Sequence, residues 1–240
     1  MLEIESRQRD KGLPAESRMR PKAAFDLTIL LLVFAASSVC IPFLNPILRS
    51  AHGFQFIFAM VLFQFCAEGL VPLTLMLIRQ ESFSRYGFTW NRLWPSLSLG
   101  LFLGILYDAA MSFYAHSILW VPLRRQPAIR IALAAGFPLN LLGITITVAV
   151  WGFLEGFFGI YFAKKINILF GHSGRGWLAP GVLAFALFNG GIHLMVGQGL
   201  EGFITSLASG YAIVVVPAIT ENAWGGTLLQ ALTNAVGKFK

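Results

Sequence analysis

Long apolar runs dominate the sequence, and several approach the roughly 20 residues that an α-helix needs to span the hydrocarbon core of a membrane. Charged residues make up 12% of the chain, whereas a soluble globular domain has about 25%. The mean hydropathy is +0.70. The apolar runs show no alternating period, which argues against a membrane β-barrel. We therefore predict an all-α, polytopic integral membrane protein folded as a helical bundle.

The distribution of polar residues predicts one membrane domain preceded by a tail. Residues 1–22 are polar and mixed in charge, which predicts a cytoplasmic N-terminal tail, and residues 23–240 form a single transmembrane helical domain. About seven transmembrane helices are predicted, at residues 23–48, 54–78, 95–119, 137–163, 177–196, 201–219 and 222–237. Residues 121–136 are expected to form a loop or an interfacial segment.

The basic residues predict an orientation in the membrane. The formal net charge is +7, and the basic residues lie between the apolar runs, where they face lipid headgroups. This placement indicates contact with anionic lipid and gives no sign of nucleic-acid binding. Of the 18 Lys and Arg residues, 12 fall on the side of the N-terminus in the seven-helix topology. The bias predicts a cell-membrane protein with a cytoplasmic N-terminus.

The stretch Trp151–Asn167 carries a single carboxylate, Glu155, inside an otherwise apolar run that ends in a pair of lysines. A charged side chain near the middle of a bilayer costs at least about 2.5–3.5 kcal/mol, so such a residue usually has a function. Glu68 and Asp108 also lie in apolar runs, but each is isolated. For these two we favour a packing role, in which the side chain hydrogen-bonds to a neighbouring helix.

Three further polar residues lie in the fifth and seventh predicted helices. His193 is near the end of its helix, and its sequence context leaves a packing role and a functional role equally open. Gln230 and Asn234 are four residues apart and therefore share one helix face. By themselves these two are typical of helix packing. Gly152 and Gly156 have the small-residue spacing that permits close approach of another helix near Glu155.

The order of these groups resembles the CPBP family of intramembrane metalloproteases, which includes the type II CAAX prenyl proteases and the Abi proteins. The similarity covers about residues 86–236 and is greatest at residues 220–234. The family has Glu-Glu-x-x-x-Arg on one helix, Phe-x-x-x-His on the next and His-x-x-x-Asn on a later one. Three of these positions are kept, by Glu155, His193 and Asn234. The remaining positions hold Gly156, Ile160, Asn189 and Gln230.

The resemblance implies an endopeptidase that hydrolyses a peptide bond of a membrane-associated or lipid-modified substrate. In the family, the first Glu and the first His activate a water, and the second His and the Asn stabilise the oxyanion. The amide of Gln230 has an N–H donor, as an imidazole does, so it can occupy an oxyanion site. The predicted catalytic residues are therefore Glu155, His193, Gln230 and Asn234.

The resemblance also implies a divalent metal such as zinc, but one imidazole, one carboxylate and two amides are a poor ligand set for Zn²⁺. We therefore leave the cofactor open. Loss of the second Glu, the Arg and the second His favours an alternative, a catalytically inactive membrane scaffold or binding protein of the same fold. A second alternative is a small proton-coupled transporter in which Glu155 and His193 relay protons. Membrane lipids and a peptide or lipidated peptide are the expected partners.

Overall fold

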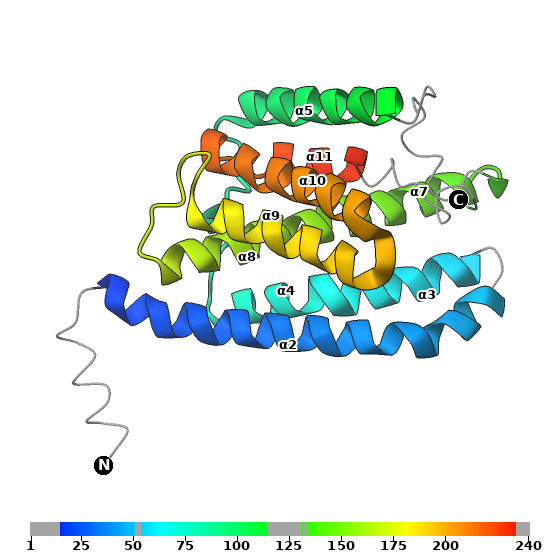
Figure 1. The fold of residues 1–240 in the computed structure, drawn as a ribbon, viewed down its shortest axis with the longest axis horizontal. Coiled ribbons are helices and arrows are strands. Elements are labelled where there is room, and N and C mark those ends of the chain that lie inside the picture. Colours follow the sequence, from blue (N-terminus) through cyan, green and yellow to red (C-terminus); the bar gives the residue numbers. More distant parts are fainter. Residues whose placement is uncertain (1–14, 51–53, 115–130, 132–133, 234–240) are drawn as a thin grey trace, which may run out of the picture.

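A computed structural model describes residues 15–50, 54–114, 131 and 134–233, and every regular element in these ranges is a helix. The bundle is shown in Figure 1. The elements are α2 (Ala15–Ser50), α3 (Phe54–Gln64), η1 (Phe65–Gly69), α4 (Leu70–Ile78), η2 (Phe83–Tyr86), α5 (Leu93–Tyr114), α7 (Leu139–Thr147), η4 (Val148–Leu154), α8 (Glu155–Leu169), α9 (Pro180–His193), η5 (Leu194–Gln198), α10 (Gly199–Thr220) and α11 (Trp224–Thr233).

Five helical segments in the described part of the chain are long and apolar enough to cross a membrane. They are Met19–Cys40, Phe54–Ile78, Leu93–Tyr114, Leu139–Leu169 and Gly199–Thr220. Two of the seven predicted spans do not reach this length: α9 has 14 residues, and α11 has 10 described residues. The all-helical fold class is confirmed, and the structure describes five candidate spans where the sequence predicts seven.

Large apolar side chains cover much of the outer surface, as expected of a chain surrounded by lipid. Phe58, Leu77 and Phe102 are each more than 60% exposed, and all three belong to candidate spans. Soluble proteins rarely expose large groups of apolar side chains to water. The helices are therefore apolar on their outer faces as well as at their contacts.

The core is centred on α8, which lies between α2 on one side and α9 on another (Figure 1). Its aromatic residues Phe157, Phe158, Tyr161 and Phe162 are buried. They pack against rings from neighbouring elements, as in the stacked pair of Phe162 and Phe188, whose centroids are 5.0 Å apart. A helix that is apolar all round is expected at the centre of a bundle, and residues 156–163 of α8 have this character.

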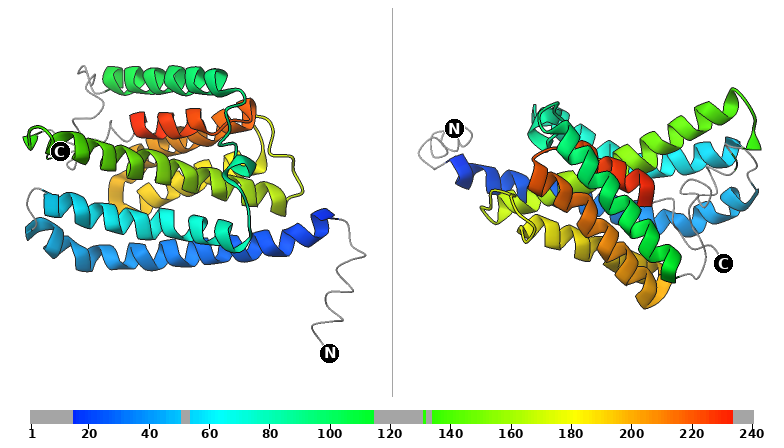
Figure 2. Two further views of the ribbon diagram at one scale, coloured as in Figure 1. Left: turned by 180° about the vertical axis from the view of Figure 1, so that it is seen from behind. Right: turned by 90° about the horizontal axis from the view of Figure 1, so that it is seen from above.

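Small residues let several helices touch through their backbones. A Cβ atom added to Gly225 on α11 would lie 1.9 Å from the carbonyl oxygen of Ser96 on α5. The same pair of helices lies side by side in both views of Figure 2. Gly152 faces Ala231, and Gly156 faces Thr227, so α11 also packs closely on the stretch around Glu155. The prediction that these two glycines permit close packing is confirmed.

Two helices extend more than five residues beyond their predicted bounds. The first helix was expected from residue 23 but α2 begins at Ala15, because the polar residues before the apolar run include good helix formers. The fourth helix was expected to end at residue 163, whereas α8 continues through Lys164 and Lys165 to Leu169. Lys165 is 2% exposed, because it forms ion pairs with residues from other helices. The lysine pair therefore belongs to the bundle.

Charged residues gather at one end of the bundle, where α2 begins, α4 and α8 end, and α5 begins (Figure 1). Lys22, Arg79, Arg85 and Lys165 line a common cavity there. Arg175 lies at the same end, because it lines a second pocket together with Arg85. The start of α2 (residues 15–22), the connector after α4 and the loop after α8 thus lie together, as the predicted topology requires. The side of the membrane that this end faces stays a prediction.

Candidate intramembrane carboxylate site

Glu68 and Glu155 lie opposite one another where two π-helical turns meet. Glu68 is within η1, and Glu155 follows η4 directly. The two turns are packed together, since a Cβ atom on Gly69 would lie 3.0 Å from Cδ1 of Leu154. The two carboxylates consequently interact electrostatically. π-Helical turns are rare and are frequently found at functional sites, so this pair is the main candidate site.

The surroundings of Glu68 are apolar and incompletely hydrogen-bonded. The side chain of Gln64, one turn earlier, hydrogen-bonds to it. Oε2 of Glu68 is buried and has no hydrogen-bond partner within the described ranges. An unsatisfied buried carboxylate oxygen is costly and usually has a functional explanation. The packing role that the sequence favours for Glu68 does not explain why this oxygen has no hydrogen-bond partner among the described residues.

Gln230 lies on α11 at about the depth of Glu155. The neighbouring residue Ala231 contacts Gly152, which is one turn before Glu155 on the adjoining π turn. Gln230 is 5% exposed, and its Oε1 has no hydrogen-bond partner in the part of the chain that the structure describes. The short helix therefore brings one of the predicted oxyanion residues into the core beside α8.

His193 is the last residue of α9, and its Nδ1 lies 2.8 Å from Oε1 of Gln198 in the following turn. The helices α8 and α9 are antiparallel, because Gly181 near the start of α9 contacts the backbone of Ala163, whereas Phe185, later in α9, faces Gly159, earlier in α8. Counting residues from that contact at 1.5 Å each places His193 about 6 Å farther along the bundle than Glu155. Gln198 as the partner of His193 was not expected from the sequence.

The remaining predicted site residue, Asn234, lies outside the described residues. The described part of the chain contains no group of three or more His, Cys, Asp or Glu side chains placed to hold a metal ion. Two carboxylates with amides nearby also do not match the His- and Cys-rich sets that hold zinc. The described residues thus do not fit the zinc that the resemblance implies, and we derive no step through a metal.

An ion-pair network at the charged end was missed by the sequence analysis. Asp26 is fully buried; its Oδ1 accepts hydrogen bonds from Nε and Nη2 of Arg79, at 3.1 and 2.9 Å. Its Oδ2 accepts one from Nζ of Lys165, at 2.8 Å. The same Nζ bonds to Glu81 at 3.0 Å, and Glu81 also pairs with Arg85 at 3.1 Å. The sequence does show acidic and basic residues near the ends of the apolar runs. The signs of these charges alone do not indicate which residues pair with each other.

Tyr86 closes this network from the connector. Its hydroxyl donates a hydrogen bond to Glu81, and its ring stacks on that of Tyr161, with centroids 5.2 Å apart. Burial, followed by the hydrogen bond to Glu81, raises the pKa of Tyr86 far above its ordinary value. The hydroxyl therefore keeps its proton and remains a donor throughout the physiological range.

Comparison with known proteins adds no relatives. No protein-family model, no curated protein and no solved structure matches this chain. The fold and the site thus define a class by their own features: within the described residues, a helical membrane protein with five candidate membrane spans and two interacting carboxylates in its core.

Proposed function

We propose that this chain is a CPBP-like intramembrane endopeptidase whose site is formed by Glu155 and its neighbours. The observation that carries the proposal is the electrostatic pairing of Glu155 with Glu68 inside the candidate spans. In the family motif the second carboxylate follows the first on the same helix, and Gly156 stands at that position here. Glu68 supplies a second carboxylate from a neighbouring helix.

The proposed chemistry is hydrolysis by an activated water. Glu155 accepts a proton as the water oxygen attacks the carbonyl carbon of the substrate peptide, because a carboxylate in an apolar site is a strong base. The amide of Gln230 donates a hydrogen bond to the developing oxyanion, together with Asn234. The C–N bond then breaks, the proton passes to the leaving amine, and a carboxylate product remains. Glu68 positions Glu155 and accepts the second proton of the water when the product carboxyl group ionises.

The apolar surroundings favour a substrate that already lies in the membrane. The five candidate spans give the site lipid neighbours, so a membrane-associated or lipid-modified peptide reaches it by lateral diffusion. The charge bias of the sequence supports a cell-membrane protein whose charged end faces the cytoplasm. Membrane lipids and the peptide are the proposed partners.

The proposal is tested with the full chain in lipid nanodiscs and a library of fluorogenic, lipid-modified peptides. Glu155→Gln is expected to reduce cleavage at least about 100-fold, the usual contribution of a general base. Glu68→Gln is expected to reduce it less. Asp108→Asn is the matched control, since Asp108 is another buried carboxylate in a candidate span, and it is expected to cleave normally. Equal cleavage by the native chain and Glu155→Gln would exclude the mechanism.

The alternative function is a non-catalytic scaffold or peptide-binding protein of the same fold. The hydrogen bond between His193 and Gln198 favours it, because this bond directs the imidazole toward the turn that follows α9. Such a protein would bind the lipidated peptides without releasing product, and Glu155→Gln would leave their dissociation constants unchanged. Peptide binding measured beside cleavage in the same nanodiscs distinguishes the two functions.

A further inference from the structure

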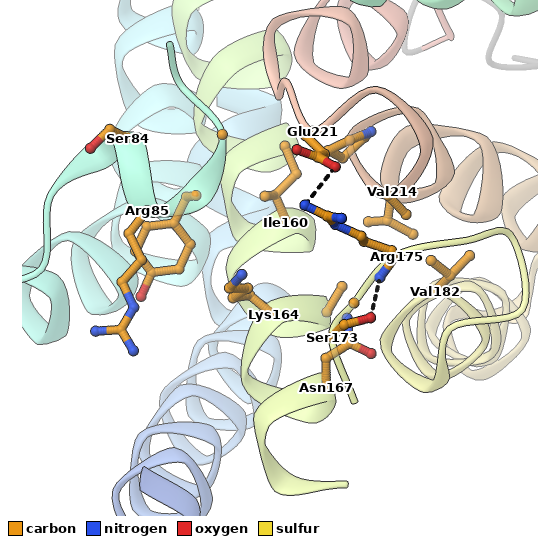
Figure 3. A pocket seen from close by; sticks show the side chains of 16 residues that line it. Ser84, Arg85, Ile160, Lys164, Asn167, Ser173, Arg175, Val182, Val214 and Glu221 are labelled. Carbon is orange, nitrogen blue, oxygen red and sulfur yellow. Dashed lines mark hydrogen bonds and ion pairs between the residues drawn. The ribbon is translucent and has the colours of Figure 1, made fainter. Parts of the chain in front are cut away.

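A pocket of about 280 Å³ opens at the charged end, separate from the carboxylate site. It lies between the connector after α4, the outer half of α8, the loop after α8 and the end of α10 (Figure 3). Its volume is at the lower end of the range for small-molecule sites, so it suits a compact group such as a lipid headgroup. Its polar and charged lining residues are Ser84, Arg85, Tyr86, Lys164, Asn167, Ser173, Arg175 and Glu221.

The pocket has an excess of positive charge. Arg85, Lys164 and Arg175 line it, against a single lining carboxylate, Glu221. Arg85 also pairs with Glu81 outside the pocket, so the excess rests mainly on Lys164. Glu221 is already engaged, by Nη2 of Arg175 at 2.9 Å and by Nη1 of Arg92 at 3.6 Å. Figure 3 shows Arg175 and Lys164 on different walls, with the Arg175–Glu221 ion pair above Lys164. A group placed between these walls meets cations on two sides.

Lys164 differs from its neighbour Lys165 in having an available charge. Lys165 forms ion pairs with Asp26 and Glu81 and is buried. No carboxylate of the described residues lies within ion-pair distance of Lys164, which lines the pocket half-buried on α8. Glu81, which Arg85 and Lys165 already engage, interacts with Lys164 only from beyond that distance. A partly buried ammonium group that forms no ion pair favours binding of an anion. The two lysines thus have different roles: one stabilises the bundle, and the other supplies charge to the pocket.

The depth of the pocket corresponds to the headgroup layer. Three tryptophans near this end are strongly exposed, with fractions of 85% for Trp90, 76% for Trp94 and 63% for Trp177. Exposed tryptophans gather at the interface between water and membrane. The inner wall of the pocket is apolar and includes Ile160, Val214 and Pro217. Cations therefore lie toward the interface, and apolar side chains lie toward the core.

We propose that this pocket binds a phosphate group, carried by the headgroup of an anionic phospholipid. Arg175 donates charge-assisted hydrogen bonds to the phosphate oxygens, and Lys164 supplies a point charge from the opposite wall. Basic pockets between membrane helices bind anionic headgroups in this way. The same chemistry would accept free phosphate, so the experiment must separate the two sources.

The test measures binding to the purified full chain in neutral detergent by native mass spectrometry. The probes are dioleoyl phosphatidylglycerol, dioleoyl phosphatidylcholine and inorganic phosphate, each titrated alone. Phosphatidylglycerol is expected to bind at least tenfold more tightly than either of the others. Lys164→Gln and Arg175→Gln are each expected to weaken this binding about tenfold, the value of one charge-assisted hydrogen bond. Lys164→Arg keeps the charge and is expected to retain binding.

The control variant is Lys22→Gln, which removes one exposed charge from the same end but lies outside the pocket. It is expected to bind phosphatidylglycerol as the native chain does. An equal loss in this control would show general attraction to a basic surface and would overturn the site. Inorganic phosphate binding as tightly as the lipid would overturn the lipid source. Failure of the peptidase assay has no bearing on either outcome.

Discussion

Asp26 and Lys165, which are 139 residues apart in the chain, form a buried ion pair with 2.8 Å between Oδ2 and Nζ. The pair joins α2 to α8, and both side chains are at most 3% exposed. Charges of this kind are tolerated in a core when each is fully paired. At one end of the bundle the helices are therefore held together by ion pairs, whereas in its middle they are held together by aromatic packing around α8.

We expect Lys165→Met to destabilise the bundle by about 3 kcal/mol, because it leaves Asp26 and Glu81 buried with fewer partners. Lys164→Met removes the same charge from the adjacent position and is expected to change stability by less than about 0.5 kcal/mol. The free energy of unfolding in mixed micelles of mild and denaturing detergent checks the pair. Similar values for both variants would contradict a structural role specific to Lys165.

Gly225→Ala should separate α11 from α5. The added methyl group would lie 1.9 Å from the carbonyl oxygen of Ser96, so the helices must move, which costs about 1–3 kcal/mol or more. Gly191→Ala on α9 is the matched control, since nothing lies within 4 Å of its added Cβ. Alanine is the better helix former by about 1 kcal/mol, so this control should keep or gain stability. A loss in the control equal to that in Gly225→Ala would show that the contact is unimportant.

Asn222 fixes the turn between α10 and α11 to the connector before α5. Its Nδ2 donates to the carbonyl oxygens of Thr89 and Asn91, both at 2.7 Å, and its Oδ1 accepts from the backbone N–H of Trp224 at 3.0 Å. We expect Asn222→Ala to cost about 2–3 kcal/mol, since three hydrogen bonds are lost at a fully buried site.

The control for Asn222 is Asn140→Ala. Asn140 makes a local hydrogen bond to the backbone of the next residue, in an exposed setting, so a small effect is expected. Thermal unfolding of the two variants in the same detergent measures the difference. Identical midpoints would indicate that the turn is held by other contacts.

Tyr86 predicts a pH dependence above the ordinary tyrosine pKa. Because burial and the bond to Glu81 raise the pKa of Tyr86 in the folded state, the unfolded chain loses this proton first as the pH rises above about 10. The contribution of Tyr86 is thus complete below pH 10 and decreases above it. In Tyr86→Phe the free energy of unfolding should lack this decrease with rising pH. Parallel pH profiles for the two proteins would argue against it.

The sequence predicted the helical class, the position of most spans and a functional place for Glu155, but not its partner. Glu68 and Glu155 are separated by 87 positions, and the apolar residues around each of them cover every face of the helix. A helix without a polar face gives no indication of which side meets which neighbour. The π turns add to this uncertainty, because one extra residue in a helical turn changes the direction in which all later side chains of that helix point.

The chain by itself determined that it forms long apolar helices, since the backbone polar groups of such runs are satisfied in lipid by helices. Tertiary structure decided which polar side chains face each other. Lys164 and Lys165 are adjacent and chemically identical, yet one is held by Asp26 and the other lines an open pocket. Successive residues point about 100° apart on a helix, so the packing of neighbouring helices, and not residue type, separates their roles.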